Sequence, residues 1–314
     1  MTRSALITGA SGFVGTCLVR YLLQKGWYVH LLLREQSSVD DFTASEGQLT
    51  LHRCDGSYSS IEQIVKASAP DVVYHLASLF LTQHQTSDIA RLTESNLLFP
   101  TLLLEAMHKC GVRNLVNTGT SWQNYENHAY NPVNLYAATK EAFEKLALFY
   151  IDAYGFKMTT LRLFDTYGPG DKRKKLFYLL RETARSGAVL NMSPGDQVIN
   201  VVYGEDVAAA FLIAGEQLLV SEGVTSHVYG VSAENLLTLR ELVVLYSEVT
   251  GYAVNINWGG LPYRPREVMS PWTDFVTVPG WKQHVVLTDG ILAMESDVTL
   301  NGLKVMTVGV PLLE

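Results

Sequence analysis

The chain has 314 residues, a mass of 34.8 kDa and a formal net charge of −7 at pH 7. Its composition, 47% hydrophobic and 18% charged, suits a folded protein with a large core and excludes a disordered chain. No basic cluster is long enough for a nucleic-acid surface, and no apolar run reaches the roughly 18 residues of a membrane helix. Three widely spaced cysteines lack the spacing of a zinc site, which predicts a cytoplasmic protein without a metal.

The first fifteen residues predict a strand, a tight turn and a helix. The apolar run Ala5–Ile7 leads into the turn Gly9–Gly15, and helical apolar periodicity follows from Phe13 to Leu23. The glycine spacing, GxxGxxG, has one residue more between the first two glycines than the usual fingerprint. Glycine lets a phosphate approach backbone N–H groups at the helix N-terminus and lets the helix pack on the strand. We therefore expect a dinucleotide to contact Gly9, Ser11, Gly12, Phe13, Val14 and Gly15.

The end of the second strand indicates which dinucleotide binds. This strand is predicted at Trp27–Leu33 and is followed by Arg34. At this place an acidic residue bonds the ribose 2′-hydroxyl of NAD, whereas an arginine accommodates the 2′-phosphate of NADP. Arg34 favours NADP(H) over NAD(H); an ordinary surface arginine beside Glu35 is the alternative. Asp55, after a third strand at Leu49–Arg53, is placed to meet the adenine edge.

Strands and helices go on alternating, as in a doubly wound parallel sheet. A fourth strand at 71–78 ends in small residues that can pass beneath a cofactor. A long helical pattern at 88–109 is interrupted at Pro100, and a fifth strand at 112–118 precedes Thr120 and Ser121. Parallel sheets bind ligands at the C-terminal ends of their strands, so these hydroxyls are candidate partners of a substrate oxygen.

Tyr136 and Lys140 begin a helical segment that runs to about Tyr154. Positions i and i+4 share a helix face, so the phenol and the ammonium face one site. A free tyrosine has a pKa of about 10. We expect the nearby cation, helped by the positive ring of an oxidised nicotinamide, to lower that pKa. Thr120, or Ser121 in its place, would hold the substrate oxygen against the phenol.

With this combination of motifs the sequence resembles the extended short-chain dehydrogenases/reductases that act on nucleotide sugars, over roughly residues 3–290. The resemblance rests on Gly9–Gly15, Asp55, His75–Ala77, Asn96, Thr118–Thr120, Tyr136–Lys140, Leu161–Pro169 and Val201–Val207. Two further stretches, Asn117–Trp122 and Asn131–Tyr136, are similar to the reductases that complete CDP-linked 3,6-dideoxyhexoses of O-antigens, the abequose and paratose synthases.

The resemblance implies an α/β fold, a Rossmann doubly wound parallel sheet with a smaller C-terminal α/β substrate domain. It implies that Tyr136 is the general acid/base, that Lys140 holds the nicotinamide ribose, and that Thr120 is the hydroxyl partner. The expected cofactor contacts beyond the glycine turn are Arg34, Asp55, Leu76, Ala77, Ser78, Asn96, Thr118, Tyr136, Lys140 and Leu163. The expected substrate contacts are Thr120, Ser121, Asp165, Leu176, Asn191 and Arg264.

Departures from the family pattern indicate the reaction. Ser121 and Trp122 stand where 4,6-dehydratases have an acidic pair, and Arg34 stands where NAD-retaining epimerases have an acidic residue. We therefore predict NADPH-dependent reduction of the C4 keto group of a nucleotide-linked, CDP-type 4-keto-deoxyhexose. An NAD-dependent 4-epimerase is the alternative, and a non-catalytic dinucleotide-sensing protein is a second one. Asp165 replaces a usual asparagine, and 199–200 replace an Arg-Asp pair, so nucleotide recognition is expected to differ in detail.

We expect residues 1–165 and 200–230 to form the dinucleotide-binding domain, and 166–199 and 231–297 the sugar-nucleotide domain. The apolar tail 298–314 lacks a helical pattern, and no role is assigned to it.

Two basic segments could meet phosphate. Arg264, or Arg266 beside it, lies in an element that resembles the family's diphosphate-binding arginine, and a guanidinium suits phosphate oxygens; a surface loop is the alternative. The short cluster 172–175 indicates a solvated loop and a phosphate site equally. The resemblance also implies a homodimer formed by the helix of Tyr136 and the helix at 88–109.

Overall fold

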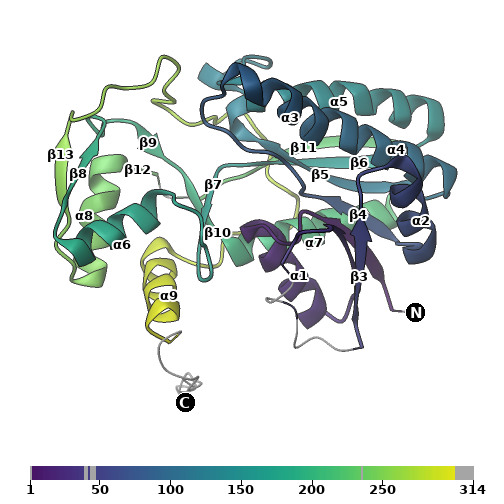
Figure 1. The fold of residues 1–314 in the computed structure, drawn as a ribbon, viewed down its shortest axis with the longest axis horizontal. Coiled ribbons are helices and arrows are strands. Elements are labelled where there is room, and N and C mark those ends of the chain that lie inside the picture. The colour runs from purple at the N-terminus through teal and green to yellow at the C-terminus, as the bar shows by residue number, and fades with distance from the viewer. Residues whose placement is uncertain (1, 39–41, 43–46, 235, 301–314) are drawn as a thin grey trace.

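The computed structural model describes residues 2–38, 42, 47–234 and 236–300. The larger body, at the right of Figure 1, is built on a parallel sheet in the order β11-β6-β5-β4-β1-β2-β3. Its strands are β1 (Ser4–Thr8), β2 (Tyr28–Arg34), β3 (Leu49–Cys54), β4 (Val72–His75), β5 (Asn114–Thr120), β6 (Lys157–Leu163) and β11 (Thr225–Val231). The order in which successive strands are added to the sheet reverses between the central strands β1 and β4. This order confirms the predicted doubly wound Rossmann fold. In such folds ligands bind outside the carboxyl ends of the strands at the point of reversal.

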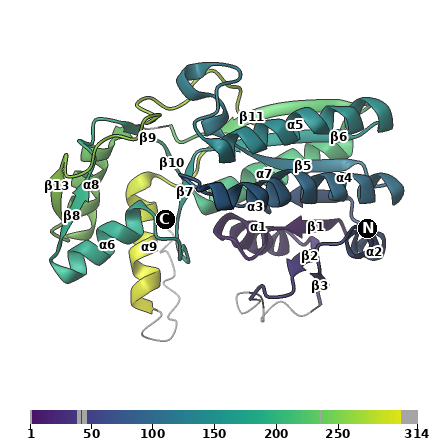
Figure 2. The ribbon, with the colours of Figure 1, turned by 45° about the horizontal axis from the view of Figure 1, so that its top comes forward.

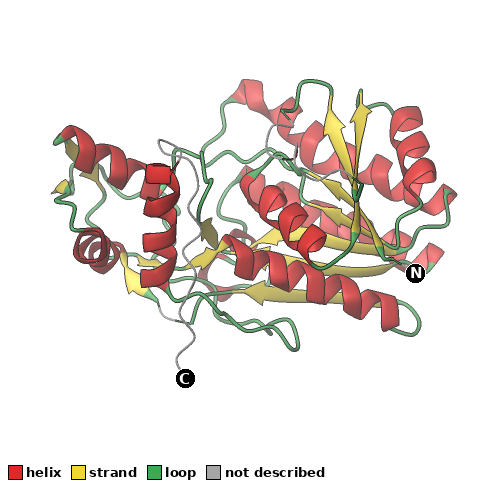
Figure 3. Cartoon of the chain, turned by 90° about the horizontal axis from the view of Figure 1, so that it is seen from below, coloured by secondary structure: helices red, strands yellow, loops and turns green. Residues whose placement is uncertain are grey.

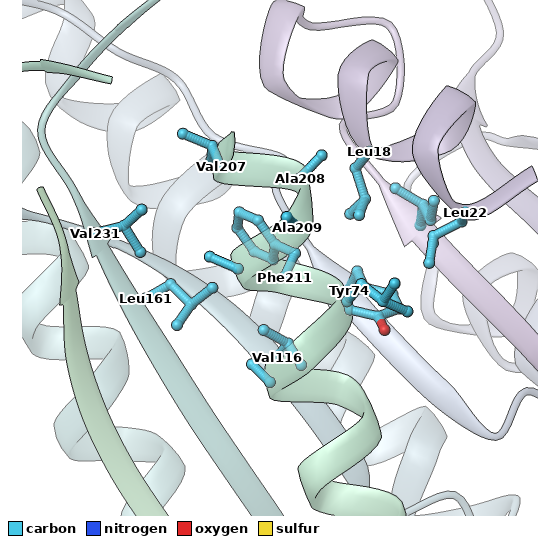
Figure 4. Close-up of a cluster of buried hydrophobic side chains, with 14 of the residues drawn as sticks. Leu18, Leu22, Tyr74, Val116, Leu161, Val207, Ala208, Ala209, Phe211 and Val231 are labelled. Carbon is cyan, nitrogen blue, oxygen red and sulfur yellow. The ribbon is translucent and has the colours of Figure 1, made fainter. Parts of the chain in front are cut away.

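Helices cover both faces of this sheet (Figure 3): α1 (Phe13–Gln24), α2 (Tyr58–Ser68), α4 (Phe99–Lys109), α5 (Leu135–Tyr154) and α7 (Gly204–Val220). Successive strand residues face opposite sides, so Ile7 packs with α1 and α7 while Leu6 packs with α2, α4 and α5. In Figure 4, Phe211 of α7 and Leu18 of α1 lie over Tyr74 of the sheet. Burying each such side chain contributes about 1.5–3 kcal/mol, and these cores hold the strand ends that form the site.

The smaller body, at the left of Figure 1, contains the following elements: α6 (Leu176–Ser186), α8 (Leu239–Thr250), α9 (Leu287–Leu300), the parallel pair β8 (Val189–Met192) and β13 (Asn255–Trp258), and the antiparallel pair β9 (Val198–Ile199) and β12 (Leu237–Thr238). Phe177, Tyr246 and Ile291 lie in its core. The parallel pair β7 (Asp165–Tyr167) and β10 (Val201–Tyr203) lies between the two bodies in Figures 1 and 2. Residues 259–286, without regular structure, bring Trp272 back to the core of the larger body.

The long helix expected at 88–109 is divided differently from the prediction. It consists of a 3-10 turn η2 (Thr86–Asp88), α3 (Ile89–Thr93), a π-helical turn η3 (Glu94–Leu98) and then α4. Pro100 does not interrupt it, because it lies in the first turn of α4, where a missing N–H costs little. The irregularity is the π-helical turn, which contains Asn96.

Helix α9 extends to Leu300, so the expectation that residues from 298 onward lack helical structure is wrong for the first three of them. The rest of that tail lies outside the described residues. Among the helices that the structure describes, none combines the length and apolar character needed to cross a membrane.

Candidate active site

The glycine turn holds the N-terminus of α1 against the ends of β1 and β4. Gly9 has φ +76°, and a Cβ there would lie 2.5 Å from Ala77 N and 2.6 Å from the carbonyl carbon of Leu76. A Cβ at Gly15 would lie 2.2 Å from Gly9 O. Gly12 donates its N–H to Gly9 O at 3.0 Å. The turn is therefore closed against backbone on both sides, and only glycine fits at positions 9 and 15.

This helix end fits the phosphates of a dinucleotide. Gly12 is the N-cap of α1, and the first turn contains neither a side-chain cap nor an acidic residue. The backbone N–H groups at this end of α1 therefore lack the side-chain partner that caps other helices. Ser11, Phe13 and Val14 lie beside them in the sequence. Thr118 Oγ1, on β5, is buried without a hydrogen-bond partner among the described residues. Both features suit a bound cofactor.

A second arginine supports the loop after β2. Arg34 is the exposed last residue of β2. Arg53, on the paired strand β3, donates Nη1 to the carbonyls of Arg34, Glu35 and Ser37 at 3.0, 3.1 and 2.7 Å. Sequence analysis missed Arg53, because its role depends on the pairing of β3 with β2. Asp55 accepts the backbone N–H of Ser57, the N-cap of α2, at 2.8 Å. Hydrogen bonding to the side chain and then to the backbone of Ser57 lowers the pKa of the Asp55 carboxyl group.

Helix α5 begins at a residue that also fixes the loop after β4. Its N-cap, Asn134, accepts the N–H of Ala137 at 2.9 Å. The same side chain donates to the carbonyls of Leu81 and Thr82 at 3.2 and 3.0 Å. The first turn of α5, which carries Tyr136, is therefore held against the segment that follows β4.

Tyr136 and Lys140 are both buried, with 9% and 2% of their surface exposed. Burial raises the pKa of Tyr136 to about 12, against a hydrogen bond with Ser78 that lowers it. Burial also lowers the pKa of Lys140 to about 8, against Glu144, which raises it. We expected a pKa below 10 for the phenol of Tyr136. This expectation is wrong for the protein without cofactor, because the loss of hydration on burial disfavours the phenolate more than other groups favour it.

Asn96 connects the loop after β4 to α5. Its Oδ1 accepts Leu79 N at 2.8 Å and Ser78 Oγ at 3.1 Å. Its Nδ2 donates to Leu79 O at 3.1 Å and to Thr139 Oγ1 at 3.0 Å. Asn96 therefore places Ser78 beside Tyr136, a role that the sequence did not indicate.

Thr120 is the last residue of β5 and the N-cap of the turn η4 (Ser121–Gln123). Its Oγ1 accepts Trp122 N at 3.3 Å, and its own N–H donates to Gln123 Oε1 at 2.9 Å. Leu163 is its partner at the end of β6. Because α5 packs against η4, the two predicted catalytic segments, one around Thr120 and one around Tyr136, meet at one edge of the sheet.

Phe80, which sequence analysis missed, lies between Tyr136 and Trp122. Its ring centre is 5.0 Å from that of Tyr136, edge to face, and 5.7 Å from that of Trp122. Lys175 Nζ lies 5.2 Å from the centre of the same ring and donates to Asp165 at 2.8 Å. Phe80 is 43% exposed, so it presents an apolar surface beside the phenol. It lies in an irregular loop, where no sequence pattern singles it out.

Arg264 lies at a small pocket that Ser121, Trp122 and Asp165 also line. Its guanidinium forms a bidentate pair with Glu267, at 2.8 and 2.5 Å, and its Cζ lies 5.6 Å from the ring centre of Trp122. The carboxylate of Glu267 raises the pKa of Arg264 further. Arg264 is therefore oriented by protein groups at the edge of the pocket.

Four candidate substrate contacts, Thr120, Leu176, Asn191 and Arg266, lie outside the lining of this pocket. Arg266 lies over the ring of Tyr125, 4.4 Å from its centre. Leu176 begins α6, and Asn191 Oδ1 accepts Asn257 Nδ2 at 2.8 Å between β8 and β13. Their part in substrate binding stays a prediction.

A parallel sheet in this order, a glycine turn and a buried Tyr–Lys pair on one helix define a Rossmann-type, nucleotide-dependent oxidoreductase. The sequence profile of the NAD dependent epimerase/dehydratase family matches residues 5–232. The chain belongs to this family, and its enzyme class is that of the NAD(P)-dependent oxidoreductases.

Among its relatives, CDP-abequose synthase of Yersinia pseudotuberculosis is 28% identical and the match covers 85% of this chain and 90% of that protein. GDP-6-deoxy-D-mannose reductase of Pseudomonas aeruginosa is 26% identical, over 95% and 97% of the two chains. The crystal structure of UDP-glucose 4-epimerase of Thermotoga maritima with UDP-glucose has a TM-score of 0.82 at 23% identity, covering 95% of this chain and 99% of that one. The structural likeness, at this identity, concerns the fold. The relatives indicate an enzyme that modifies nucleotide sugars.

Proposed function

We propose that this enzyme reduces the C4 keto group of a nucleotide-linked 4-keto-deoxyhexose, with CDP as the nucleotide and NADPH as the reductant. One observation carries the proposal: α5, the helix of Tyr136, packs against the turn η4, in which Ser121 and Trp122, instead of two carboxylates, follow Thr120. Without this acidic pair after Thr120 to move protons at neighbouring carbons, the site is suited to proton transfer at one oxygen. The similarity to CDP-abequose synthases supports CDP and a deoxysugar.

The protein's own groups account for the proton in this reaction. Thr120 Oγ and Tyr136 Oη orient the C4 carbonyl oxygen, and Tyr136 donates its proton to that oxygen as the alkoxide develops. Lys140 stabilises the resulting phenolate and holds the nicotinamide ribose. NADPH, when bound, supplies the hydride to C4. Burial of the pair excludes water, which strengthens the attraction between Lys140 and the phenolate.

The preference for NADPH rests on the end of β2. Arg34 and Arg53 bring two guanidinium groups to the strand ends where dinucleotide folds distinguish the ribose 2′ position. Neither residue is acidic, which favours a 2′-phosphate over a 2′-hydroxyl. Residues 166–199 and 231–297 would hold the sugar nucleotide, with Arg264 on its diphosphate.

The alternative is a 4-epimerase with tightly held NAD, favoured by the fold similarity to UDP-sugar epimerases bound to NAD. The reductase and the epimerase differ in the amount of reduced cofactor that each consumes per product. We would incubate the purified chain with NADPH or NADH and a panel of CDP-, dTDP-, UDP- and GDP-linked 4-keto-6-deoxy and 4-keto-3,6-dideoxy sugars. A reductase consumes one NADPH per product and, from deuterated NADPH, places the label at C4. Protein that purifies with NAD and converts a 4-hydroxy sugar without added reductant would establish the epimerase instead.

We further propose a homodimer, formed by α5 and the segment from α3 to α4. Apolar side chains on both remain exposed, including Leu98 at 52% and Phe149 at 58%. Sedimentation at the mass of one chain would contradict this. The free, widely spaced cysteines support a cytoplasmic location.

A further inference from the structure

A buried ionic network lies directly behind the site, and no step of the proposed reaction uses it. Arg162, on β6, donates Nη2 to Glu141 Oε2 at 2.8 Å and to Glu144 Oε2 at 2.6 Å. Gln123 donates Nε2 to Glu141 Oε2 and to Glu144 Oε1, at 2.7 Å each. None of these four residues is more than 9% exposed. Groups that have lost their hydration this completely need every one of these bonds.

The network joins the two segments that meet at the substrate. Glu141 and Glu144 lie on α5, the helix of Tyr136 and Lys140. Gln123 lies in the turn η4, and its Oε1 accepts the N–H of Thr120 at 2.9 Å. The carboxamide of Gln123 thus uses its acceptor on the turn and both donors on the helix. Thr120 is tied to α5 by hydrogen bonds in addition to packing.

Gly119 shows how closely β5 approaches this network. A Cβ there would lie 2.9 Å from Arg162 Cγ, 2.9 Å from Gln123 Oε1 and 3.0 Å from Glu144 Oε1. The absence of a side chain at Gly119 therefore lets the strand end rest directly on the network. The position of Thr120 relative to α5 depends on these contacts.

We propose that Gln123, Glu144 and Arg162 are positioning residues, which fix Thr120 against the helix of Tyr136 and maintain the charge of Lys140. The proposal rests on the proposed function, because it assigns a task within the same proton transfer. It extends that function to residues that do not touch the substrate.

Glu144 acts on Lys140 through charge. Tyr136 and Glu144 lie four residues before and after Lys140 on α5 and so share its helix face. His75, on β4, and Glu144 interact with Lys140 through charge. His75 is buried and bonded to Thr8 Oγ1 at 2.8 Å, and burial together with Lys140 holds its pKa well below the usual range, so it stays neutral. Glu144 is the carboxylate of this group. Burial raises its pKa above the usual range, and the charge and hydrogen bonds of Arg162 and Gln123 oppose that shift by favouring the charged form. Removing the charge of Glu144 must lower the pKa of Lys140.

Two variants separate the two tasks. Glu144→Gln retains the shape, keeps one acceptor oxygen of the two that Glu144 uses, and loses the charge. The alkaline limb of kcat/KM for NADPH should therefore move to lower pH. Gln123→Met removes the bonds that join the turn to α5 and leaves the charge of Glu144. It should lower kcat about 10- to 100-fold, with the pH limb in place and KM for NADPH within about twofold of the wild type.

A matched control exists in the smaller body. There Arg181 Nε donates to Glu295 at 3.0 Å, and Tyr246 Oη donates to the same carboxylate at 3.1 Å. Glu295→Gln should lower the melting temperature as Glu144→Gln does, with kcat and the pH limb unchanged. If Glu295→Gln lowers kcat as much as the two site variants, or if Glu144→Gln leaves the limb in place, the network is structural only and the proposal is wrong.

Amide hydrogen exchange separates failure of this proposal from failure of the proposed function. Wild-type protein that turns over no keto-sugar contradicts the proposed function. The exchange of the Thr120 N–H still tests the network, because Gln123→Met should speed it at least tenfold relative to wild type and Glu295→Gln should not. Equal exchange in all three proteins overturns the proposal, even if the variants fold poorly enough to prevent assays.

Discussion

The pH dependence of the reaction should report Lys140. Burial lowers the pKa of this ammonium to about 8 and raises that of Tyr136 to about 12. About nine-tenths of the molecules then carry the lysine charge at pH 7 and about one-tenth at pH 9, while the phenol keeps its proton at both. The charge is needed to stabilise the phenolate as its proton leaves. We expect kcat/KM for NADPH, which reports the free enzyme, to fall about tenfold per pH unit above about pH 8.

The assay is the initial rate of NADPH consumption across this range, with circular dichroism at each pH. The folded pKa of Lys140 lies below the 10.5 of an unperturbed lysine. The unfolded chain therefore binds more protons between about pH 8 and 10.5, and the contribution of Lys140 to the free energy of unfolding rises with pH in this window. Loss of activity by titration of Lys140 therefore runs opposite to its effect on stability.

Lys140→Arg tests the assignment, because a guanidinium stays charged throughout the range. This variant should be slower at pH 7 but lose the alkaline limb. Lys109→Gln, at an exposed lysine of α4, is the control and should keep the wild-type profile. A wild-type profile that is flat to about pH 10, or a limb that persists near pH 8 in Lys140→Arg, would refute the reasoning.

Three further substitutions test other parts of the site. Arg34→Asp should shift the ratio of kcat/KM for NADPH to that for NADH about 10- to 100-fold toward NADH, because it replaces attraction by repulsion at the 2′-phosphate. An unchanged ratio would show that Arg34 does not select the cofactor. Gly15→Ala places a Cβ 2.2 Å from the backbone oxygen of Gly9. It should lower the free energy of unfolding, measured with denaturant, by about 1–3 kcal/mol. Unchanged stability would contradict the close contact in this turn. Asp165→Asn removes the ion pair between the half-exposed Asp165 and Lys175. It should lower KM for the nucleotide sugar by about two- to fivefold, because it removes an anion beside the expected diphosphate. A raised KM would show that Asp165 binds the substrate directly.

Local patterns in the sequence predicted the parts of the site that neighbouring residues form. The glycine turn is such a part, because its backbone conformation and its closeness to the strand depend on residues within one short segment. The pair Tyr136 and Lys140 is another, since helix geometry alone puts both on one face. The strands β1 to β5 followed from their apolar runs, which burial in the sheet requires, whereas β6 and β11 were not predicted.

The residues that sequence analysis missed act across the chain. Phe80 and Arg53 lie in or beside segments without a distinctive pattern, and each gains its role only when another strand or helix is placed beside it. The π-helical turn that presents Asn96 follows from tertiary contacts with α5, because its sequence continues the helical periodicity on both sides. Helix α9 was missed for the same reason, since it is held by α8 in the smaller body.

The pKa of Tyr136 also depends on tertiary structure, and it bears on the direction of the reaction. From spacing alone, a lysine four residues away predicts an acidic phenol, but burial disfavours the phenolate more than the hydrogen bond with Ser78 favours it. The negative charge of Asp165 raises the pKa of Tyr136 further. A phenol that holds its proton is ready to protonate a carbonyl oxygen, whereas an epimerase must begin by removing a proton from a C4 hydroxyl. In the proposed reduction Tyr136 begins the reaction with its proton, as its raised pKa requires at neutral pH.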